Sequence, residues 1–385
     1  MFDGNALPVV RQAIRDCTTD QRHLLDEIRT DVRDLAAQVR TIQPRTTTSI
    51  SLVASDGGNN KLVFDPFYVQ LVRVVDSYGK EHLLDAVAPT TDTDKLSERH
   101  WKVGESPRTA LGRLMQDLNA ETLNKLSHMI PKGKAALQDP GRVSPSWVQV
   151  YRDLCEWAVL YDRICYANFA TDTLLVRDGL LRSKLFRKEL FKEMTDRMEV
   201  AIERIQREDR RKVFLVGLAK HSKVLDRYGL SLRLENTFKA GDARFVRVPR
   251  PLEAKAYIWQ EWARGEQDVR PAGEAAKFVA GDMYFVRFGP MVTDPIWVVD
   301  LFTPQSGSAP ETFGYLLADA RDGFPIPYYP RCLQKADEYA QVRGFDLDVL
   351  QTEVMSAVED AVGAGARDAL DAYRLTPDLT GRRYG

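Results

Sequence analysis

The sequence has few of the features that mark secreted, membrane-spanning or disulfide-stabilised proteins. Among its 385 residues are only four cysteines, and none of them forms a C-x-x-C pair or a zinc-ribbon spacing. No apolar run approaches the ~18 residues that a membrane span needs. The first residues, MFDGNALPVVRQ, lack the basic and then apolar pattern of a signal peptide. We therefore expect a cytoplasmic protein with reduced thiols and no membrane partner.

The common signatures of catalysis are also missing. The sequence has no G-x-x-x-x-G-K-[ST] phosphate loop, no G-x-G-x-x-G turn, no H-E-x-x-H helix and no G-x-S-x-G elbow. Its five histidines are not paired at metal-ligand spacing. Nucleotide hydrolysis and zinc chemistry are therefore not expected.

The charge is almost balanced, with 54 Lys+Arg against 55 Asp+Glu and a formal net charge of −1. A protein without a global basic field must hold nucleic acid through a local groove, a partner or metal ions. Hydrophobic residues make up 44% and charged residues 28%, as in ordinary globular proteins. The length suits two or three domains, or one elaborated α/β domain with an appendage.

The hydrophobic pattern predicts strands with helices interspersed, which is typical of a mixed-sheet α/β domain. A first strand is expected to end at Asp56, before Gly57-Gly58, and a second to cover residues 67–79. The polar stretch 86–106 predicts a loop or lid. Later strands are expected at KVFLVGLAKHS, ARFVRV, DMYFVRF and PIWVVDLF, and helices at about 147–169, 183–210, 311–322, 331–342 and 346–372.

The N-terminal segment carries a heptad-like apolar seam that Pro44 ends. Because the pattern lasts fewer than three heptads, a helix packed on its own domain is favoured over pairing with a second copy or a partner, and both remain open. We expect an N-terminal helix in residues 1–45, for dimer or partner contact, a main domain in 46–375 and a tail in 376–385. The seam consists of Leu25, Ile28, Val32, Leu35, Val39 and Ile42.

Two aspartates end apolar strands in matching contexts. Asp56 and Asp178 each lie on the apolar face of a predicted strand and precede a glycine. A carboxylate there is costly to bury unless it is neutralised. If the two strands are neighbours, the carboxylates can share Mg²⁺ or Mn²⁺, which suits phosphodiester cleavage. The alternative, that each Asp-Gly is simply a turn, remains open.

Five segments resemble those of NurA nucleases, in the same order. The resemblance spans about residues 45–345 and implies an RNase H-like mixed-sheet core with flanking helices after the N-terminal helical segment. It also implies a Mn²⁺- or Mg²⁺-dependent site, with two ions, that cleaves DNA as a 5′-to-3′ exonuclease and endonuclease. The implied assembly is a homodimer that works with the hexameric ATPase HerA in DNA end processing or antiviral defence. The segments are SISLVASDGG, TLLVRDGLL, VFLVGLAKHS, WVVDLF and YPRCLQKAD.

The resemblance implies roles for individual residues. Asp56 and Asp178 match the family's two aspartate ligands, and Glu156, 22 residues before Asp178, matches its glutamate ligand. A solvated pair of Glu156 with Arg152 on the same helix face is the alternative. Lys220 matches a lysine that would hold the scissile phosphate or stabilise developing charge, unless it merely caps its strand into solvent.

The C-terminal motif departs from the family pattern. Tyr329 matches a family tyrosine, but the histidine expected eight residues later is Asp337 here. An aspartate can bind a metal but is a poor general base near neutrality, so altered metal preference or activity is expected. Asp300, at another strand end, has either a structural or a catalytic role.

Two other functions are compatible with the sequence. One is a non-catalytic or weakly catalytic subunit that holds DNA or regulates a translocase. The other is a phosphohydrolase of small molecules, which the lack of a phosphate-binding glycine loop disfavours. Because both Asp56 and Asp178 are present, the nuclease is preferred.

Overall fold

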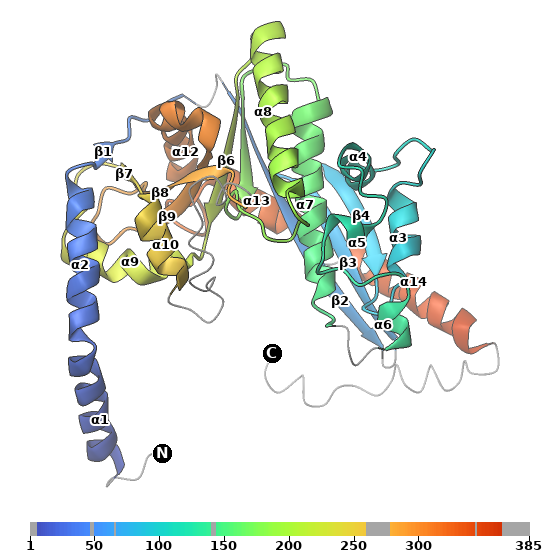
Figure 1. Ribbon diagram of the computed structural model, residues 1–385, viewed down its shortest axis with the longest axis horizontal. Helices are drawn as coiled ribbons and strands as arrows, with labels where there is room; N and C mark the ends of the chain where they lie inside the picture. Colours follow the sequence, from blue (N-terminus) through green and yellow to red (C-terminus); the bar gives the residue numbers. More distant parts are fainter. Residues whose placement is uncertain are drawn as a thin grey trace.

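The computed structural model describes residues 6–46, 50–64, 67–139, 144–258, 278–342 and 345–363. Its centre is a nine-stranded mixed sheet with the order β1-β7-β8-β9-β6-β5-β2-β3-β4 (Figure 1). The strands are β1 (Arg40–Thr41), β2 (Ser51–Phe64), β3 (Phe67–Asp76), β4 (Glu81–Val87), β5 (Thr173–Asp178), β6 (Val213–Ala219), β7 (Arg244–Arg247), β8 (Gly281–Arg287) and β9 (Trp297–Phe302).

The half of the sheet from β4 to β6 has the strand arrangement of an RNase H-like core. β3 is antiparallel to both of its neighbours, β2 and β4. β2, β5 and β6 are parallel to one another. The other half, from β9 to β1, continues the sheet with antiparallel pairs. This topology confirms the predicted α/β mixed sheet.

Helices cover both faces of the sheet (Figure 1). α7 and α8 bury one face of the β4–β6 half, and α2, α9 and α10 bury the same face of the antiparallel half. α12 and α13 bury the opposite face. The helices are α1 (Ala6–Asp20), α2 (Arg22–Ala36), α3 (Thr93–His100), α4 (Ala110–Asp117), α5 (Leu123–Leu126), α6 (Ala135–Gln138), α7 (Trp147–Tyr166), α8 (Leu190–Glu208), α9 (Lys223–Leu234), α10 (Arg250–Ile258), the 3₁₀ helix η3 (Thr303–Ser308), α12 (Ala309–Arg321), α13 (Arg331–Ala340) and α14 (Phe345–Val362).

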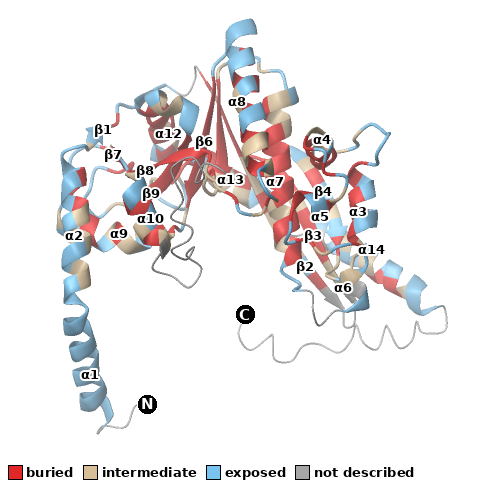
Figure 2. Ribbon diagram, in the orientation of Figure 1, coloured by how far each residue is buried: buried red, intermediate tan, exposed pale blue. Residues whose placement is uncertain are grey.

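The central strands have the sequence that this double coverage requires. β5 and β6 read TLLVRD and VFLVGLA, and nearly every residue in them is buried. Strands of a parallel sheet are covered on both faces and therefore carry continuous apolar runs. Figure 2 shows the buried strands between two layers of helices whose outer faces are exposed. Side chains at the ends of β5 and β6 consequently lie at the edge of a rigid core.

The prediction that the first strand ends at Asp56 is wrong. β2 continues through Gly57 and Gly58 to Phe64, and both glycines pair with β3. They serve close packing, because a Cβ on Gly57 would overlap the Glu156 carboxylate of α7, and one on Gly58 would overlap the main chain of α13.

The N-terminal seam packs against its own chain. Val32 and Leu35 of α2 are buried with residues of α9, β7 and β8, and Ile28 lies against them. Arg29 and Arg33 bind Glu235 just after α9, with N–O distances of 2.5 and 2.8 Å. α2 ends at Ala36, so the last two seam residues lie beyond the helix. Val32 and Leu35 thus pack within the chain, as the favoured interpretation expects, and the role of residues 1–45 in dimer or partner contact stays a prediction.

Three other predicted elements have different bounds. The expected loop 86–106 contains α3, which Asp92 caps by accepting bonds from two backbone N–H groups. The helix expected from residue 183 begins at Leu190. The helix expected over 346–372 is described up to Val362, and the predicted tail, 376–385, lies outside the described residues. Within the described ranges, none of the helices combines the length and apolar character needed to cross a bilayer.

Candidate metal centre

Asp56 and Asp178 lie together because β2 and β5 are parallel and in register. The paired residues run from Ser51 opposite Thr173 to Ser55 opposite Arg177, so the next residue on each strand is an aspartate. The residues two positions earlier on both strands are buried beneath α12 and α13. Side chains alternate along a strand, and the two carboxylates therefore lie on that same face.

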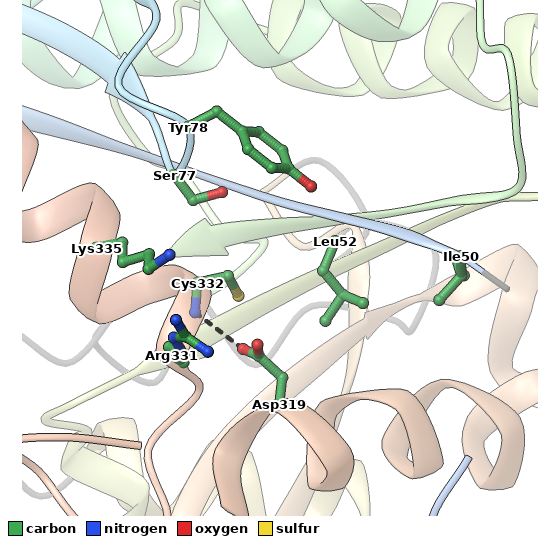
Figure 3. A pocket seen from close by; sticks show the side chains of 8 residues that line it. All are labelled: Ile50, Leu52, Ser77, Tyr78, Asp319, Arg331, Cys332 and Lys335. Atoms are coloured by element: carbon green, nitrogen blue, oxygen red, sulfur yellow. Dashed lines mark hydrogen bonds between the residues drawn. The ribbon is translucent and has the colours of Figure 1, made fainter. Parts of the chain in front are cut away.

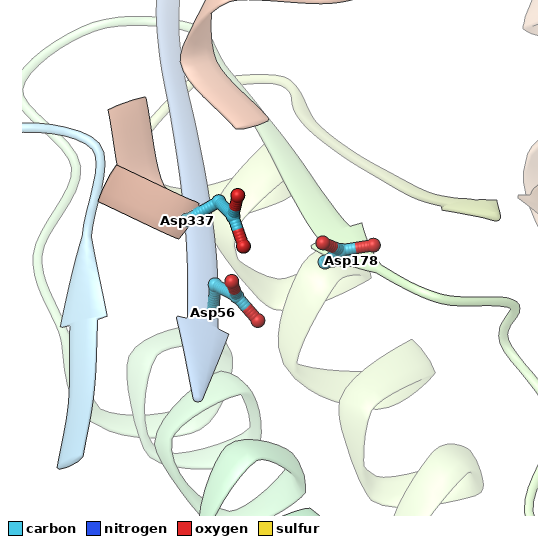
Figure 4. A group of neighbouring side chains, drawn as sticks. All are labelled: Asp56, Asp178 and Asp337. Carbon is cyan, nitrogen blue, oxygen red and sulfur yellow. The ribbon is translucent and has the colours of Figure 1, made fainter. Parts of the chain in front are cut away.

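Asp337 joins them from α13. The carbonyl of Ala340 packs so closely on β2 that any side chain at Gly58 would overlap it. This close approach puts Asp337, one turn earlier, beside the strand aspartates (Figure 4). One carboxylate oxygen from each of Asp56, Asp178 and Asp337 lies within 4.8 Å of the others. We call these three residues the acidic cluster.

Lys220 and Tyr329, both expected at the site, border the acidic cluster. Lys220 follows β6, and its Nζ lies 3.0 Å from Asp178 Oδ2 and 3.5 Å from Asp337 Oδ1. The same ammonium lies 5.6 Å from the ring centroid of Tyr329. Tyr329 is fully buried, with its ring 4.8 Å from that of Trp297. Lys220 therefore pairs with acids rather than pointing freely into solvent.

The acidic cluster carries more negative charge than its surroundings balance. Burial, and then the charge of Asp178, raise the pKa of Asp56 to about 7, although its carboxylate accepts a 2.8 Å bond from the Gly57 N–H. The Lys220 ammonium contacts two of the three acids, Asp178 and Asp337. A bound cation would favour the ionised form of each carboxylate. The cluster is thus set up to take positive charge.

The hydroxyl of Tyr329 is buried and has no hydrogen-bond partner among the residues that the structure describes. Burial, followed by the nearby charge of Asp178, raises the pKa of Tyr329, so the group stays protonated. An unpaired buried hydroxyl costs about 1–3 kcal/mol. A donor left free beside carboxylates suits a ligand oxygen that the chain itself does not supply.

Glu156, the third expected metal ligand, lies on the other side of β2. It extends from α7 toward Gly57 and pairs with Arg152 at 3.2 Å and Arg177 at 3.3 Å. Burial raises its pKa to about 8, against the effect of Arg177. The Glu156 carboxylate lies against Gly57, the residue after Asp56, but it is not part of the acidic cluster. The predicted pair with Arg152 exists, and Glu156 in it is buried rather than solvated.

The second Asp-Gly pair is both a turn and part of the cluster. Gly179 has a φ of +105°, which disfavours any other residue. Its N–H donates a 2.8 Å bond to the carbonyl of Leu218. This turn ends β5 and leaves the Asp178 carboxylate at the edge of the sheet.

Asp300 lies apart from the acidic cluster and has a structural environment. It is completely buried and accepts bonds from Arg182 Nε at 2.7 Å, Arg182 Nη2 at 2.8 Å and the Leu181 N–H at 3.1 Å. These bonds fix the segment after β5 to β9.

Sequence patterns missed two parts of this region. The close-packing role of Gly57-Gly58 was hidden because the same dipeptide also ends strands. Arg331 and Lys335 line a pocket on the other side of α13. Their i, i+4 spacing on a predicted helix was the available signal.

This chain is similar to known proteins in structure rather than in sequence. No protein-family model matches the sequence, and no curated protein matches it. The NurA nuclease from Sulfolobus solfataricus is similar with 12% identity and a TM-score of 0.36, over 91% of this chain and 97% of that chain. The structure of NurA with manganese is similar with 12% identity and a TM-score of 0.38, over 91% of this chain and 98% of that chain. The structure of NurA bound to dAMP and manganese is similar with 10% identity and a TM-score of 0.36, over 88% of this chain and 95% of that chain. The chain is thus similar to solved NurA structures over about nine-tenths of its length.

Proposed function

We propose that this chain is a metal-dependent DNA nuclease that hydrolyses phosphodiester bonds at the acidic cluster. The observation that carries the proposal is the convergence of Asp56, Asp178 and Asp337 within 4.8 Å, from three separate elements. Hard divalent cations prefer carboxylate oxygens. Their charge also allows an anionic phosphodiester to approach an acidic site.

The three carboxylates would hold Mn²⁺ or Mg²⁺, with two ions expected. Bound there, the ions would supply Lewis-acid activation of the phosphodiester and of its attacking water. The residues fit this group, because the half-buried Asp56 is held next to like charge and the Tyr329 hydroxyl is unpaired among the described residues.

Lys220 and Tyr329 would act on the phosphate. Asp178 and Asp337 would share their charge with a bound cation, and the Lys220 ammonium that pairs with them here would then be available to a phosphate oxygen. The Tyr329 hydroxyl is protonated and has no partner within the described ranges, so it can donate a hydrogen bond to the same phosphate group. Both residues orient the substrate rather than bind the metal.

Glu156 is retained as a proposed ligand. Its carboxylate lies against Gly57, the residue after Asp56. To reach a cation it must exchange one of its arginine partners, Arg152 or Arg177. Replacement by glutamine removes the ligand charge while keeping the shape, so Glu156→Gln should lose activity if the exchange takes place.

The identity of the substrate and the ATPase rests on the resemblance of the five segments to NurA. It supports DNA, 5′-to-3′ exonuclease and endonuclease activities, and a HerA-type hexameric ATPase, in end processing or antiviral defence. The net charge of −1 agrees with this assembly. Non-specific DNA affinity comes mainly from phosphate neutralisation by positive charge. A partner that delivers DNA compensates for the lack of net positive charge on this chain.

We place the partner contact on α1 rather than on the seam. None of the 15 residues of α1 is buried, and the helix extends away from the rest of the protein (Figure 2). Leu7, Val10 and Ile14 form an exposed apolar stripe. An isolated helix of this length is marginal in water. Contact with a second copy, in the proposed homodimer, or with the ATPase would stabilise it.

The nuclease is tested with end-labelled linear DNA and the purified chain in Mn²⁺, Mg²⁺ or EDTA. Wild type should cut in metal and be silent in EDTA. Asp56→Asn and Asp178→Asn should each retain no more than a few per cent of that activity, because each loses a ligand oxygen. Asp196→Asn, on the exposed side of α8, is the matched control and should cut normally. Full activity in either cluster variant would exclude this site.

The α1 contact is tested by light scattering. Wild type should be a dimer, and Val10→Glu/Ile14→Glu should shift it toward a folded monomer, because neither side chain is buried within the chain. DNA degradation should rise when a HerA-type ATPase and ATP are added. Leu35→Glu is the contrasting variant: its side chain is 1% exposed, and it should unfold rather than dissociate the protein.

A further inference from the structure

A pocket of about 220 Å³ lies on the face of the sheet that carries the acidic cluster. It is bordered by β2, the turn between β3 and β4, α12 and α13 (Figure 3). Its floor is apolar and its walls are polar. The lining residues are Ile50, Leu52, Ser77, Tyr78, Asp319, Arg331, Cys332 and Lys335.

The walls carry excess positive charge. Arg331 and Lys335 lie one turn apart on α13, and neither forms an ion pair within the part of the chain that the structure describes. The carboxylate in the pocket, Asp319, already accepts a 2.9 Å bond from the Cys332 N–H. Two cations and one carboxylate leave a net positive charge beside the cavity, and this charge attracts an anion.

An aromatic side chain stands at the mouth of the pocket. Tyr78 is 67% exposed, yet its turn is firmly held. Asp76 is buried and accepts bonds from the N–H groups of Tyr78 and Lys80 at 3.0 and 3.1 Å. It also binds His82 and Arg163, both at 3.0 Å. The main chain that carries the ring is therefore held in place, which lowers the entropic cost of stacking on the ring.

We propose that this pocket binds one nucleotide unit, with its phosphate between Arg331 and Lys335 and its base against Tyr78. Guanidinium and ammonium groups are the usual protein donors to phosphate. Every base has a π face that an aromatic ring accepts, so the contact is independent of sequence. Ile50 and Leu52 provide an apolar surface for the sugar. The proposal rests on the proposed nuclease function.

The pocket lies at a useful distance from the acidic cluster. Leu52 on its floor and Asp56 are four residues apart on one face of β2, or about 13 Å at ~3.3 Å per residue. That is the length of roughly four nucleotides in a stacked strand. Because α13 lies between the pocket and the acidic cluster, and Ala54 between Leu52 and Asp56 is buried, a strand held in the pocket would pass around α13 and be anchored at least about four nucleotides from the bond that the acidic cluster cleaves. A free mononucleotide has the same chemistry and is the second possible source of the ligand.

The test measures DNA binding without metal, so that cleavage does not enter. A short labelled single strand is titrated with the full chain in EDTA, by fluorescence anisotropy, over a range of salt concentrations. Arg331→Gln/Lys335→Gln should reduce the slope of log K against log [salt] by about 0.7, the value for the one phosphate that the two side chains hold. Arg207→Gln/Arg211→Gln, in the exposed segment at and just after the end of α8, removes the same charge and should leave the slope unchanged. Tyr78→Ala should weaken binding, and Tyr78→Phe should retain it.

Equal slopes for the wild type and Arg331→Gln/Lys335→Gln would overturn the pocket, as would equal effects of the two double variants. Competition with dAMP and with inorganic phosphate separates the two sources. Displacement of the strand by dAMP in wild type supports a mononucleotide site, and resistance to it together with the slope change supports a strand site. If the slope changes as expected but the wild type cuts no DNA in Mn²⁺, the nucleotide pocket is supported and the proposed nuclease function is overturned. If the wild type cuts DNA but Arg331→Gln/Lys335→Gln leaves the slope unchanged, only the nucleotide pocket is overturned.

Discussion

Two groups of carboxylates lie at the same sheet, and they differ in how their charges are balanced. In the first, each acid contacts arginine. Arg182 binds Asp300 at 2.7 Å and Glu253 at 2.5 Å. Arg250 binds Glu253 at 3.1 Å and Asp282 at 3.2 Å, and Asp282 also accepts a 2.8 Å bond from Arg247. This arginine-paired cluster consists of Asp300, Glu253, Asp282, Arg182, Arg250 and Arg247.

The acidic cluster lacks this balance. Its three carboxylates share the ammonium of Lys220, which contacts two of them. Asp56 accepts a hydrogen bond from a backbone N–H, but it forms no ion pair within the described residues. A buried network whose charges are all paired is complete without a ligand, and an unbalanced one is not. Charge balance thus distinguishes Asp300 from Asp56, two strand acids that look alike in the sequence.

Removing one cation from each cluster should produce the largest contrast. Arg182→Met leaves Asp300, which is fully buried, without its main partner, and loss of one partner of a buried pair costs about 3–5 kcal/mol. Lys220→Met removes a group that is 30% exposed and should cost far less, while it lowers nuclease activity. Urea unfolding of both variants measures the difference. Equal destabilisation would show that the two clusters are held in the same way.

The sequence predicts the parity of the strand acids but not their neighbours. Asp56 and Asp178 could be placed on apolar faces because side chains alternate along a strand. Which strands pair is decided by long-range packing, since β2 and β5 are separated by α3 to α7. The apolar periodicity likewise could not predict that α13 brings Asp337 to the acidic cluster. Its approach depends on Gly58, and a glycine reads equally well as a strand end.

The N-terminal seam shows the same limit. Apolar spacing fixes which face of a helix is buried, and Val32 and Leu35 are indeed buried. It does not say whether the covering surface belongs to the same chain, because apolar surface is buried equally well by either. Glu235, which binds Arg29 and Arg33, is more than two hundred residues away. Only the folded chain brings it there.

A pH titration should sharpen the comparison through Asp56. Its pKa is raised from 3.8 to about 7 by burial and by Asp178, so the folded state binds this proton more tightly than the unfolded chain. Stability without metal should therefore fall as pH rises from about 4 to about 7, by at most ~4 kcal/mol. Asp56→Asn should remove this part of the dependence, while Glu156, raised in the same direction, still contributes. Thermal unfolding at several pH values, in EDTA, measures it.

Mn²⁺ should reverse this trend, because a cation binds the ionised carboxylates and adds stability that grows with pH. In Asp56→Asn the added stability should be small. An arginine-paired cluster shows no such response, so Asp282→Asn should keep the Mn²⁺ effect of wild type if it folds. A wild-type melting temperature that does not respond to Mn²⁺ at pH 8 would count against metal binding at the acidic cluster.

The smallest effect is expected from Asp337→His, which tests how the acidic cluster tolerates lost charge. Asp337 is the most exposed of the two acids that contact Lys220, at 46% against 17% for Asp178, so the change should cost little stability. Imidazole is a good ligand for Mn²⁺-like metals and titrates near neutrality, and Mn²⁺-dependent cleavage should therefore be kept or raised. Because Asp337 also raises the pKa of Asp56, its loss should let Asp56 ionise at lower pH and move the onset of activity in the same direction. A folded but inactive variant would show that the carboxylate of Asp337, and not merely a metal ligand at that position, is required.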